Sequence, residues 1–378
     1  MALKESQRTL LGHSEAKIKL LDLYLKRYLR IVSASKYFGD IHVYDLFCGE
    51  GIYPNGGKGS PIIILETIRD AYYSSQSAVK SNVNFNCLFN DWKREHVDKL
   101  AKIIESNQLH HKRIGRLRFE NKNYRSLLPT IVQEINDLKN EKAFIFIDPY
   151  GYKDIKANDI KTLLDNKRSE VLLFLPTQFM FRFEKKGTPR SLIDLIDELI
   201  PEEEWPNSKT GIDFIENLKT GFQHYLGDDF FVDTFVIQRD LNQFFCLFFF
   251  TSHIYGFEQM LDVKWKMDEE EGRGWLNETE LNLFTDLEKK PNSLRLKQNL
   301  SKFLKNGKRT NADVYRFTLD NSHLPKHSME ILKEMFREGK LKTFKKDGEP
   351  ARKNAFYLNY KSYKEDPDRI FFKVGENG

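Results

Sequence analysis

Cysteine is scarce in this sequence of 378 residues. There are three cysteines, Cys48, Cys87 and Cys246, and they lie far apart. Widely separated cysteines in apolar, strand-like surroundings provide neither a disulfide framework nor the paired spacing of a zinc site. We therefore expect no metal site, and a location in a reducing compartment, the cytoplasm.

Long apolar runs are missing as well. The longest, residues 243–250, is far shorter than the roughly 20 residues that cross a bilayer. The first ten residues carry both acid and base and no apolar signal core, so neither a membrane span nor a secretory signal is expected. Aromatic residues, by contrast, are plentiful: 30 Phe and 16 Tyr argue against disorder over most of the length.

Charge is distributed unevenly along the chain. Residues 289–373 hold 22 Lys and Arg against 10 Asp and Glu, whereas residues 1–288 hold 38 against 44. The net charge of +5 therefore comes from the C-terminal part. A basic module behind a mildly acidic body predicts a domain that binds a polyanion, and a solvated lysine-rich surface is the alternative.

Apolar runs of strand length alternate with helical patterns through the first two thirds of the chain. An amphipathic helix is expected at 16–32, and strands are expected at 41–47, 84–90, 116–120, 143–147 and 170–175, with helices between them. This alternation predicts an α/β fold with a Rossmann-like parallel sheet covered on both faces. After a helical insert at about 189–225, two adjacent strands, 229–238 and 243–251, would form an antiparallel hairpin at the sheet edge.

The pattern changes to short helices beyond the acidic run at 267–272. Helices are expected at 293–304, 311–319 and 326–338, followed by a ribbon of two strands, 341–344 and 355–358, joined by a turn at 345–350. Three helices and a basic hairpin predict a winged helix-turn-helix. We expect two domains, residues 1–275 and a basic domain of residues 276–378.

A glycine turn after the first strand is the sharpest motif. Asp45 ends the strand, and Gly49 and Gly51 follow in the segment Asp45-Leu-Phe-Cys-Gly-Glu-Gly51. Glycine there permits a tight turn and lets a ligand lie against bare backbone. The stretch resembles the D-x-F-x-G-x-G segment with which class I methyltransferases hold S-adenosylmethionine. The resemblance implies that Asp45, Phe47, Gly49 and Gly51 bind this cofactor; a purely structural turn is the alternative.

Polar residues near the next elements extend this prediction. Asp91 follows the second strand, where such folds place an acid that accepts hydrogen bonds from two ribose hydroxyls; a helix N-cap is the alternative. Asn123 follows the third strand, at the place of an adenine-contacting residue, and is otherwise a loop asparagine. Ser60 is explained as a helix N-cap before Pro61, although that helix start can also face the methionine carboxylate.

The segment Asp148-Pro-Tyr-Gly151 follows the fourth strand. It resembles the D/N-P-P-Y/F/W tetrad of amino-methyltransferases, and more closely the D-P-F-G of tRNA guanine N2-dimethyltransferases. In that role Asp148 and a backbone carbonyl accept the two protons of an exocyclic amine and direct its lone pair at the methyl donor. Pro149 would fix the loop and Tyr150 would stack on the base. A β-turn is the alternative.

These motifs occur together in one order. The set comprises His13 and Lys17, Tyr44–Gly51, Gly59–Pro61 and Phe146–Gly151. It is similar to the three-Cys-motif partner (TcmP) family over about residues 1–270, and the tail is similar in architecture. The resemblance implies a class I S-adenosylmethionine-dependent methyltransferase with a winged helix-turn-helix tail, and a protein partner that bears a three-cysteine motif. His13 and Lys17 share one helix face, which we expect to be a solvated helix start.

The prediction from sequence is methyl transfer from S-adenosylmethionine to an exocyclic amine of a nucleobase in DNA or RNA. The basic domain would hold the nucleic acid by its phosphates. One alternative is a regulator that senses S-adenosylmethionine and binds nucleic acid without catalysis. Another is a methyltransferase whose acceptor is a protein partner or a modified-base intermediate.

Overall fold

The computed structural model describes residues 12–35, 37–77, 83–150, 155–184, 190–199, 208–240, 243–276 and 291–374. Its contacts divide the chain into two compact units. The first unit is residues 1–253 with 274–282, and the second is residues 254–273 with 283–378. The sequence analysis placed residues up to 275 in one domain, whereas the segment 254–273 packs with the second unit.

The first unit is built on an eight-stranded sheet with the strand order β3-β2-β1-β4-β5-β7-β6-β8. The strands are β1 (Ile41–Asp45), β2 (Phe85–Asn90), β3 (Leu117–Glu120), β4 (Lys142–Ile147), β5 (Ser169–Leu175), β6 (Phe231–Asp240), β7 (Gln243–Thr251) and β8 (Gly274–Leu276). The strands β1 to β5 are parallel, while β7 runs antiparallel to both β5 and β6. The predicted α/β class and the predicted hairpin are therefore confirmed. The short strand β8, which joins β6 in parallel, was not predicted.

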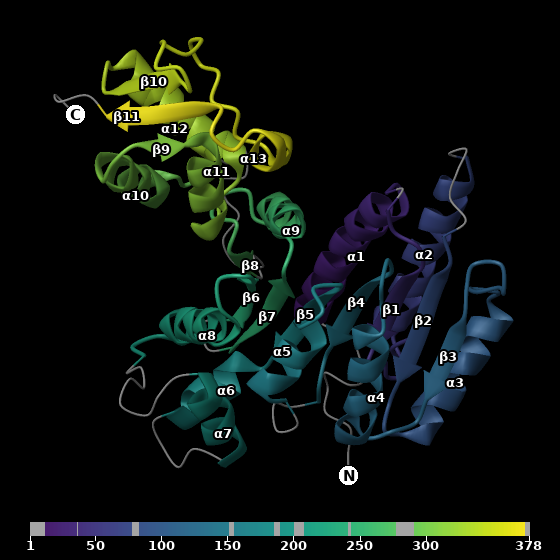
Figure 1. Cartoon of the computed structure of the whole chain (residues 1–378). Helices are drawn as coiled ribbons and strands as arrows, with labels where there is room; N and C mark the ends of the chain where they lie inside the picture. Colours follow the sequence, from purple (N-terminus) through teal and green to yellow (C-terminus); the bar gives the residue numbers. More distant parts are fainter. Residues whose placement is uncertain are drawn as a thin grey trace. The chain divides into compact units, whose positions relative to one another are not determined.

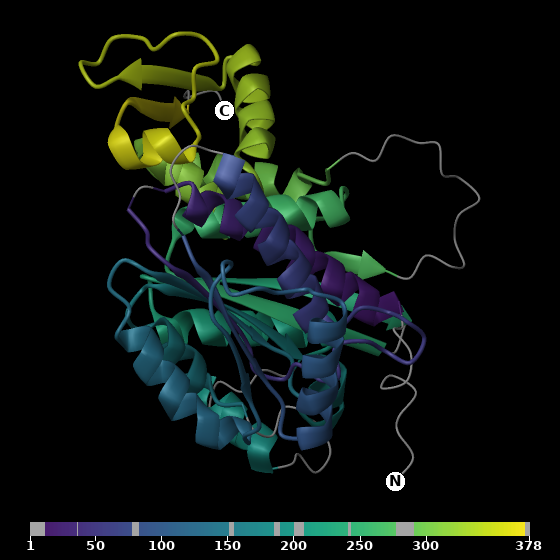
Figure 2. The ribbon, with the colours of Figure 1, turned by 90° about the vertical axis from the view of Figure 1, so that its right-hand side faces the viewer.

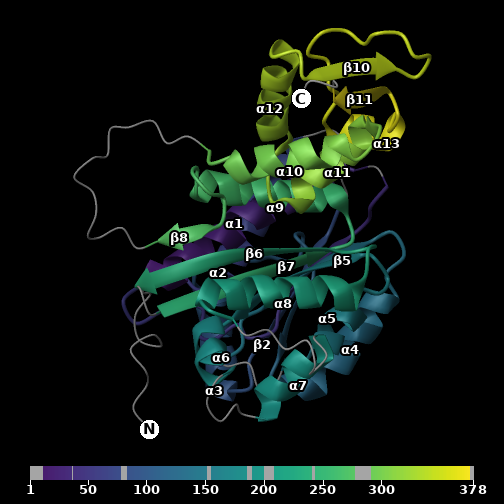
Figure 3. The same cartoon turned by 90° about the vertical axis from the view of Figure 1, so that its left-hand side faces the viewer.

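Helices cover both faces of this sheet. They are α1 (Gly12–Ser33), α2 (Ser60–Ser77), α3 (Arg94–Ser106), α4 (Tyr124–Asn136), α5 (Ala157–Leu164), α6 (Thr177–Glu184), α7 (Arg190–Leu199) and α8 (Gly211–Leu226). The helices α4, α5 and α8 pack on one face with Ile145 and Ile147 of β4 (Figures 1 and 3). On the other face α1 and α2 lie side by side, and Tyr24 of α1 contacts Phe144 (Figure 2). Because both faces are buried, the strands read as continuous apolar runs.

The second unit contains helices packed beside a three-stranded sheet of order β10-β11-β9 (Figure 1). Its elements are α9 (Ile254–Met267), α10 (Leu294–Lys305), β9 (Arg309–Thr310), α11 (Asn311–Asp320), α12 (Pro325–Arg337), β10 (Leu341–Lys345), α13 (Tyr360–Glu365) and β11 (Ile370–Val374). The three predicted helices are confirmed as α10, α11 and α12. No helix in the described ranges of either unit is long and apolar enough to cross a membrane.

The predicted partner strand of the wing is wrong. Residues 355–358 form no strand, and β10 pairs instead with β11, with Leu341 opposite Val374. Asn354 and Tyr357 have positive φ angles of 59° and 54°, which a strand does not accommodate. Phe356 is buried and contacts Phe372 of β11, so this segment is apolar because it packs on the sheet rather than joining it.

Candidate functional site

The sequence motifs of the first unit meet at one edge of the sheet. The strand β1 lies between β2 and β4, with Asp45 level with Phe89 on one side and Phe146 on the other. The segments that follow these three strands therefore emerge together at their carboxyl ends, where open α/β sheets bind ligands. Asn90 fixes this edge: its side-chain amide donates to the carbonyls of Leu46 (3.0 Å) and Lys122 (3.1 Å). The sequence analysis did not identify Asn90, because its partners are distant backbone groups.

The two glycines of the turn serve different purposes. Gly49 and Gly51 have positive φ angles of 61° and 81°, which favour glycine. A Cβ on Gly51 would lie 2.5 Å from Cδ1 of the buried Leu100, whose side chain would have to move to admit it. A Cβ on Gly49 would meet no described atom within 4 Å. Gly49 thus presents bare backbone to open space, as a turn that holds a ligand requires.

Asp91 lies fully buried beside this turn. Its Oδ2 accepts the Gly49 N–H at 3.1 Å and the hydroxyl of Tyr150 at 2.7 Å. Its Oδ1 accepts the N–H of Lys93 at 2.9 Å, and the ring of His96 lies 3.3 Å away. Asp91 is therefore not the N-cap of α3, a position that Lys93 occupies. It ties the loop after β2 to the glycine turn.

Tyr150 bridges the predicted cofactor and acceptor sides of the site. Its hydroxyl binds Asp91, and its ring meets Phe47 edge-on with a centroid distance of 6.4 Å. Burial of the hydroxyl and the negative charge of Asp91 raise the pKa of Tyr150. Phe47 in turn stacks on Tyr124 at 5.4 Å. The preceding Pro149 is buried, and Gly151 of the predicted tetrad lies outside the described residues.

Asp148 forms a part-buried ion pair with Lys17 of α1, through its Oδ2. Burial is the largest single influence on the pKa of Lys17 and lowers it, but the charge and hydrogen bond of Asp148, together with Tyr53 and Asp45, make the net shift upward. The ammonium also lies 4.5 Å from the centroid of the Phe174 ring. The prediction that Lys17 belongs to a solvated helix start is wrong, because its side chain is 8% exposed. The helical pattern of α1 shows which residues share a face with Lys17. It does not show that this face meets Asp148, which lies 131 residues away in the sequence.

Asp45 is fully buried at the end of β1. Burial raises the pKa of its carboxyl to about 7, although the Ser60 hydroxyl and the Phe47 N–H favour the charged form. The nearby Asp148 raises it further. Its Oδ2 has no hydrogen-bond partner in the described part of the chain. A buried acceptor without a partner is costly, so this atom is suited to a ligand donor or a cation.

Ser60 and Asn123 differ in how well they fit their predicted roles. Ser60 is not the N-cap of α2, since the Gly59 carbonyl already accepts the Ile63 N–H and the Gly59 N–H donates to Gly51. The Ser60 hydroxyl instead influences Asp45, which keeps it at the site. Asn123 is exposed and caps α4, where its side chain accepts the Arg125 N–H at 2.9 Å. The capping role of Asn123 is neither of the two predicted roles, and its contact with adenine stays a prediction.

Trp92 is a further candidate that the sequence analysis did not select. It directly follows Asp91, and it is 59% exposed, unlike most large apolar side chains of this unit. The side chain of Asn121 holds this loop by donating to the carbonyls of Asp91 and Trp92, both at 2.9 Å. An exposed indole on a fixed loop beside a glycine turn offers a flat surface for an aromatic ligand.

Comparison with known proteins identifies the type of the second unit. The sequence model of the GMT-like wHTH domain family matches residues 269–348. No curated protein matches the chain in sequence. The predicted C-terminal winged helix-turn-helix is therefore confirmed, although the TcmP family is not.

Solved structures resemble part of the chain at low sequence identity. A protein from Legionella pneumophila is 11% identical, with a TM-score of 0.40 over 66% of this chain and 88% of its own. The O-methyltransferase TomG from Streptomyces achromogenes, in complex with SAM, is 10% identical with a TM-score of 0.34 over 61% and 78%. An O-methyltransferase from Bacillus cereus, in complex with SAH, is 12% identical with a TM-score of 0.33 over 61% and 80%. The Rossmann-like fold of the first unit is established by its own strand order, and the second unit contains a winged helix-turn-helix.

Proposed function

We propose that the first unit transfers a methyl group from S-adenosylmethionine to an exocyclic amine of a nucleobase. The observation that carries the proposal is the position of Asp148. Asp148 directly follows β4, which pairs with β1, and the glycine turn after β1 borders open space. The Oδ1 atom of Asp148 receives no hydrogen bond from the described residues. An acceptor for an amine and a place for a methyl donor are therefore adjacent.

The residues beside the glycine turn fit S-adenosylmethionine. Gly49 leaves room for it, and Asp91 already accepts a hydroxyl hydrogen bond of the kind that a ribose hydroxyl would make. The exposed Trp92 offers a face for the adenine. Asp45, which has no described cationic partner as close as Lys17 is to Asp148, supplies negative charge for a sulfonium. When bound, the cofactor supplies an electrophilic methyl group.

Asp148 would act on the acceptor by hydrogen bonding. Lys17 holds its Oδ2, which fixes the carboxylate and leaves Oδ1 to accept an N–H of the amine. That hydrogen bond aligns the nitrogen lone pair with the methyl group, so Asp148 contributes orientation and charge stabilisation. Pro149 would restrict the loop, and Tyr150 would stack on the base, which a duplex must first extrude.

The remaining parts of the proposal concern partners. The basic C-terminal domain would contribute phosphate contacts that do not depend on base sequence. A protein with a three-cysteine motif, implied by the resemblance to TcmP, would be a further partner of the first unit.

Asp148→Asn tests the proposal. The variant should still bind S-adenosylmethionine in a calorimeter, which shows that it folds, while transfer of radiolabelled methyl groups to nucleic acid falls at least a hundredfold. Mass spectrometry of digested nucleosides identifies the methylated base in reactions of the unaltered chain. Absence of cofactor binding by the unaltered chain would sink the proposal.

The same experiment separates the sensing regulator. A regulator would bind nucleic acid equally well with or without Asp148 and would form no methylated product to lose. Methyl incorporation into protein, with none in nucleic acid, would instead identify a protein acceptor.

A further inference from the structure

One face of the three-stranded sheet in the second unit carries aromatic and basic side chains. In the antiparallel register of β10 and β11, Phe344 lies opposite Phe371 and Lys342 lies opposite Lys373. These four residues alternate with the buried residues of the same strands, so they share the face turned away from the core. Thr310 of β9 lies opposite Phe371 and extends this face toward α10.

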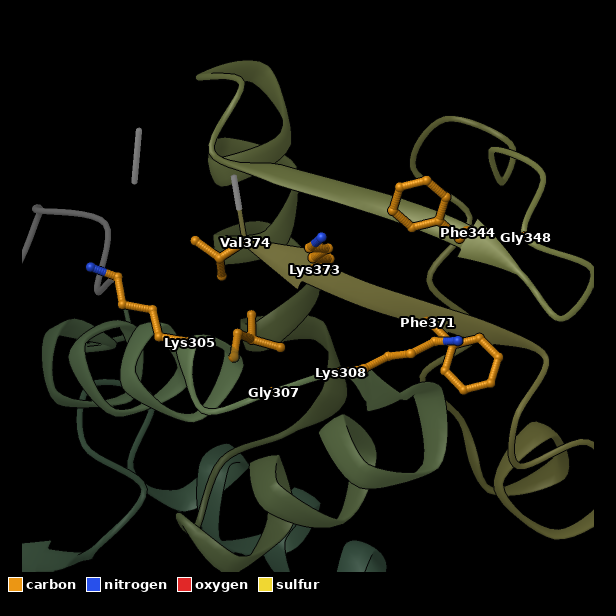
Figure 4. A pocket seen from close by; sticks show the side chains of 9 residues that line it. Lys305, Gly307, Lys308, Phe344, Gly348, Phe371, Lys373 and Val374 are labelled. Atoms are coloured by element: carbon orange, nitrogen blue, oxygen red, sulfur yellow. The ribbon is translucent and has the colours of Figure 1, made fainter. Parts of the chain in front are cut away.

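This face borders a cavity of about 590 Å³, here named the lysine–phenylalanine cavity (Figure 4). It is lined by Leu304, Lys305, Gly307, Lys308, Phe344, Gly348, Phe371, Lys373 and Val374. The two phenylalanine rings are half-buried, and the three lysines are exposed. Lys308 reaches across the opening, and its Nζ lies 3.6 Å from the centroid of the Phe371 ring. The cavity therefore combines two aromatic rings with three exposed cationic side chains, one of which, Lys308, lies over the ring of Phe371.

The positive charge of this face is not balanced by neighbouring acids. Some lysines elsewhere in the unit are paired, such as Lys346 with Asp368 at 2.6 Å and Lys297 with Glu334 at 2.8 Å, whereas others, such as Lys326 and Lys333 of α12, have no ion pair with a described residue. No ion pair with a described residue is found for the lysines of this face, which are Lys305, Lys308, Lys342 and Lys373. Like charges directly opposite each other, as in Lys342 and Lys373, destabilise a strand pair. An anionic partner would relieve that repulsion.

The exposed side of α12, the second helix of the helix-turn-helix, differs in charge. Its exposed Lys326, Lys333 and Arg337 are interspersed with Glu330, and Glu334 lies on the same helix. A helix of this position usually enters the major groove of a duplex. The cations of α12 thus alternate with acids along the helix, whereas β10 and β11 contain no acid and carry their lysines beside aromatic rings.

We propose that the lysine–phenylalanine cavity binds an unpaired stretch of nucleic acid. The lysines would neutralise backbone phosphates, and the rings of Phe344 and Phe371 would stack on bases. Only an unpaired strand offers free base faces to such rings, because a duplex stacks its bases on one another. The site is separate from the methyl-transfer site, and binding to it does not depend on S-adenosylmethionine.

Fluorescence polarisation of the full chain with labelled oligo(dT), oligo(U) and a duplex of equal length tests the proposal. Both single strands should bind at least tenfold more tightly than the duplex. Phe371→Leu should weaken single-strand binding about tenfold, since stacking on one ring contributes an effect of that order, while Phe371→Tyr keeps the ring and the affinity. Retention of affinity by the tyrosine variant separates stacking from a folding defect.

Charge is tested with Lys308→Gln/Lys373→Gln. The double variant should lower the slope of log affinity against log salt by about 1.4, because each single-strand phosphate contact contributes about 0.7. Lys346→Gln and Lys297→Gln, changed together, remove the same charge from lysines that are already paired and should leave the slope nearly unchanged. Tighter binding of the duplex, no loss with Phe371→Leu, or an equal effect of the two lysine pairs would overturn the proposal.

Discussion

Replacing Lys17 and replacing Asp148 should lower the free energy of unfolding by different amounts, although either change breaks the same ion pair. The Lys17 side chain is 8% exposed, whereas that of Asp148 is 22% exposed. Asp148→Asn leaves an ammonium that water barely reaches, so we expect a loss of about 3–5 kcal/mol. Lys17→Met keeps the apolar stem and leaves a carboxylate with better access to water. For this change we expect a loss of about 1–3 kcal/mol.

The double variant Lys17→Met/Asp148→Asn should cost less than the two single changes combined, by about 2 kcal/mol, because no unpaired charge remains. Native-state hydrogen exchange of the β1 and β4 amides measures these losses within the first unit alone. Lys26→Met is the matched control, since its pair with Asp22 on the same helix is half-exposed at the lysine and should contribute under about 0.5 kcal/mol. Additive costs, or a larger cost for Lys17→Met than for Asp148→Asn, would refute the reasoning.

Three further predictions concern the glycine turn, the Tyr150 hydroxyl and a buried histidine. Gly49→Ala should abolish S-adenosylmethionine binding in calorimetry with a loss of only about 1–2 kcal/mol in stability, whereas Gly51→Ala should also unfold more readily because its Cβ would meet Leu100. Tyr150→Phe should tighten cofactor binding about three- to tenfold, because Asp91 Oδ2 would no longer accept the hydroxyl of Tyr150 and could accept one from the cofactor. Weaker binding would contradict the idea that the Tyr150 hydroxyl competes with the cofactor for Asp91. Burial, with the charges of His323 and Lys326, lowers the pKa of His327 from 6.5 to about 4. The unfolded state therefore binds more protons between these values, and the second unit should lose about 3 kcal/mol as pH falls from 6.5 to 4. Urea titrations at several pH values measure this, and His327→Gln should remove most of the dependence.

The sheet was predictable because its central strands are buried on both faces. Residues 143–147 and 171–175 read as unbroken apolar runs, and such runs separated by helical patterns indicate parallel strands. The carboxyl-end motifs could then be placed at one edge from their order along the chain. The wing was harder to predict, since residues 355–358 are as apolar as a strand but are buried by packing on β11. Composition does not distinguish these two reasons for burial.

Side-chain partners that are distant in sequence were the main omission. Lys17 and Asp148 lie 131 residues apart, and Tyr150 and Asp91 lie 59 apart. A helical period shows which residues share a face, but not which strand end that face meets. The same limit applies to Ser60: its sequence context favours a cap, while the structure directs its hydroxyl to Asp45, because Gly59 is already held by Gly51.

The carboxyl edge of the sheet is suited to a positively charged ligand because its charge is only partly compensated. Lys17 pairs with Asp148, but Asp45 remains buried with a pKa of about 7 and with Oδ2 unpartnered in the described residues. Near neutral pH the carboxyl of Asp45 can therefore gain or lose a proton easily. When no ligand is bound, Asp45 can be protonated, and the fold then holds no second charged carboxylate beside Asp148. A sulfonium near Asp45 would favour its charged form, and binding would then be coupled to release of that proton. If Lys17 were absent, a bound sulfonium would be the one positive charge shared by the carboxylates of Asp148 and Asp45. The buried ammonium of Lys17 on α1 is therefore needed to balance Asp148, so that Asp45 can balance the ligand.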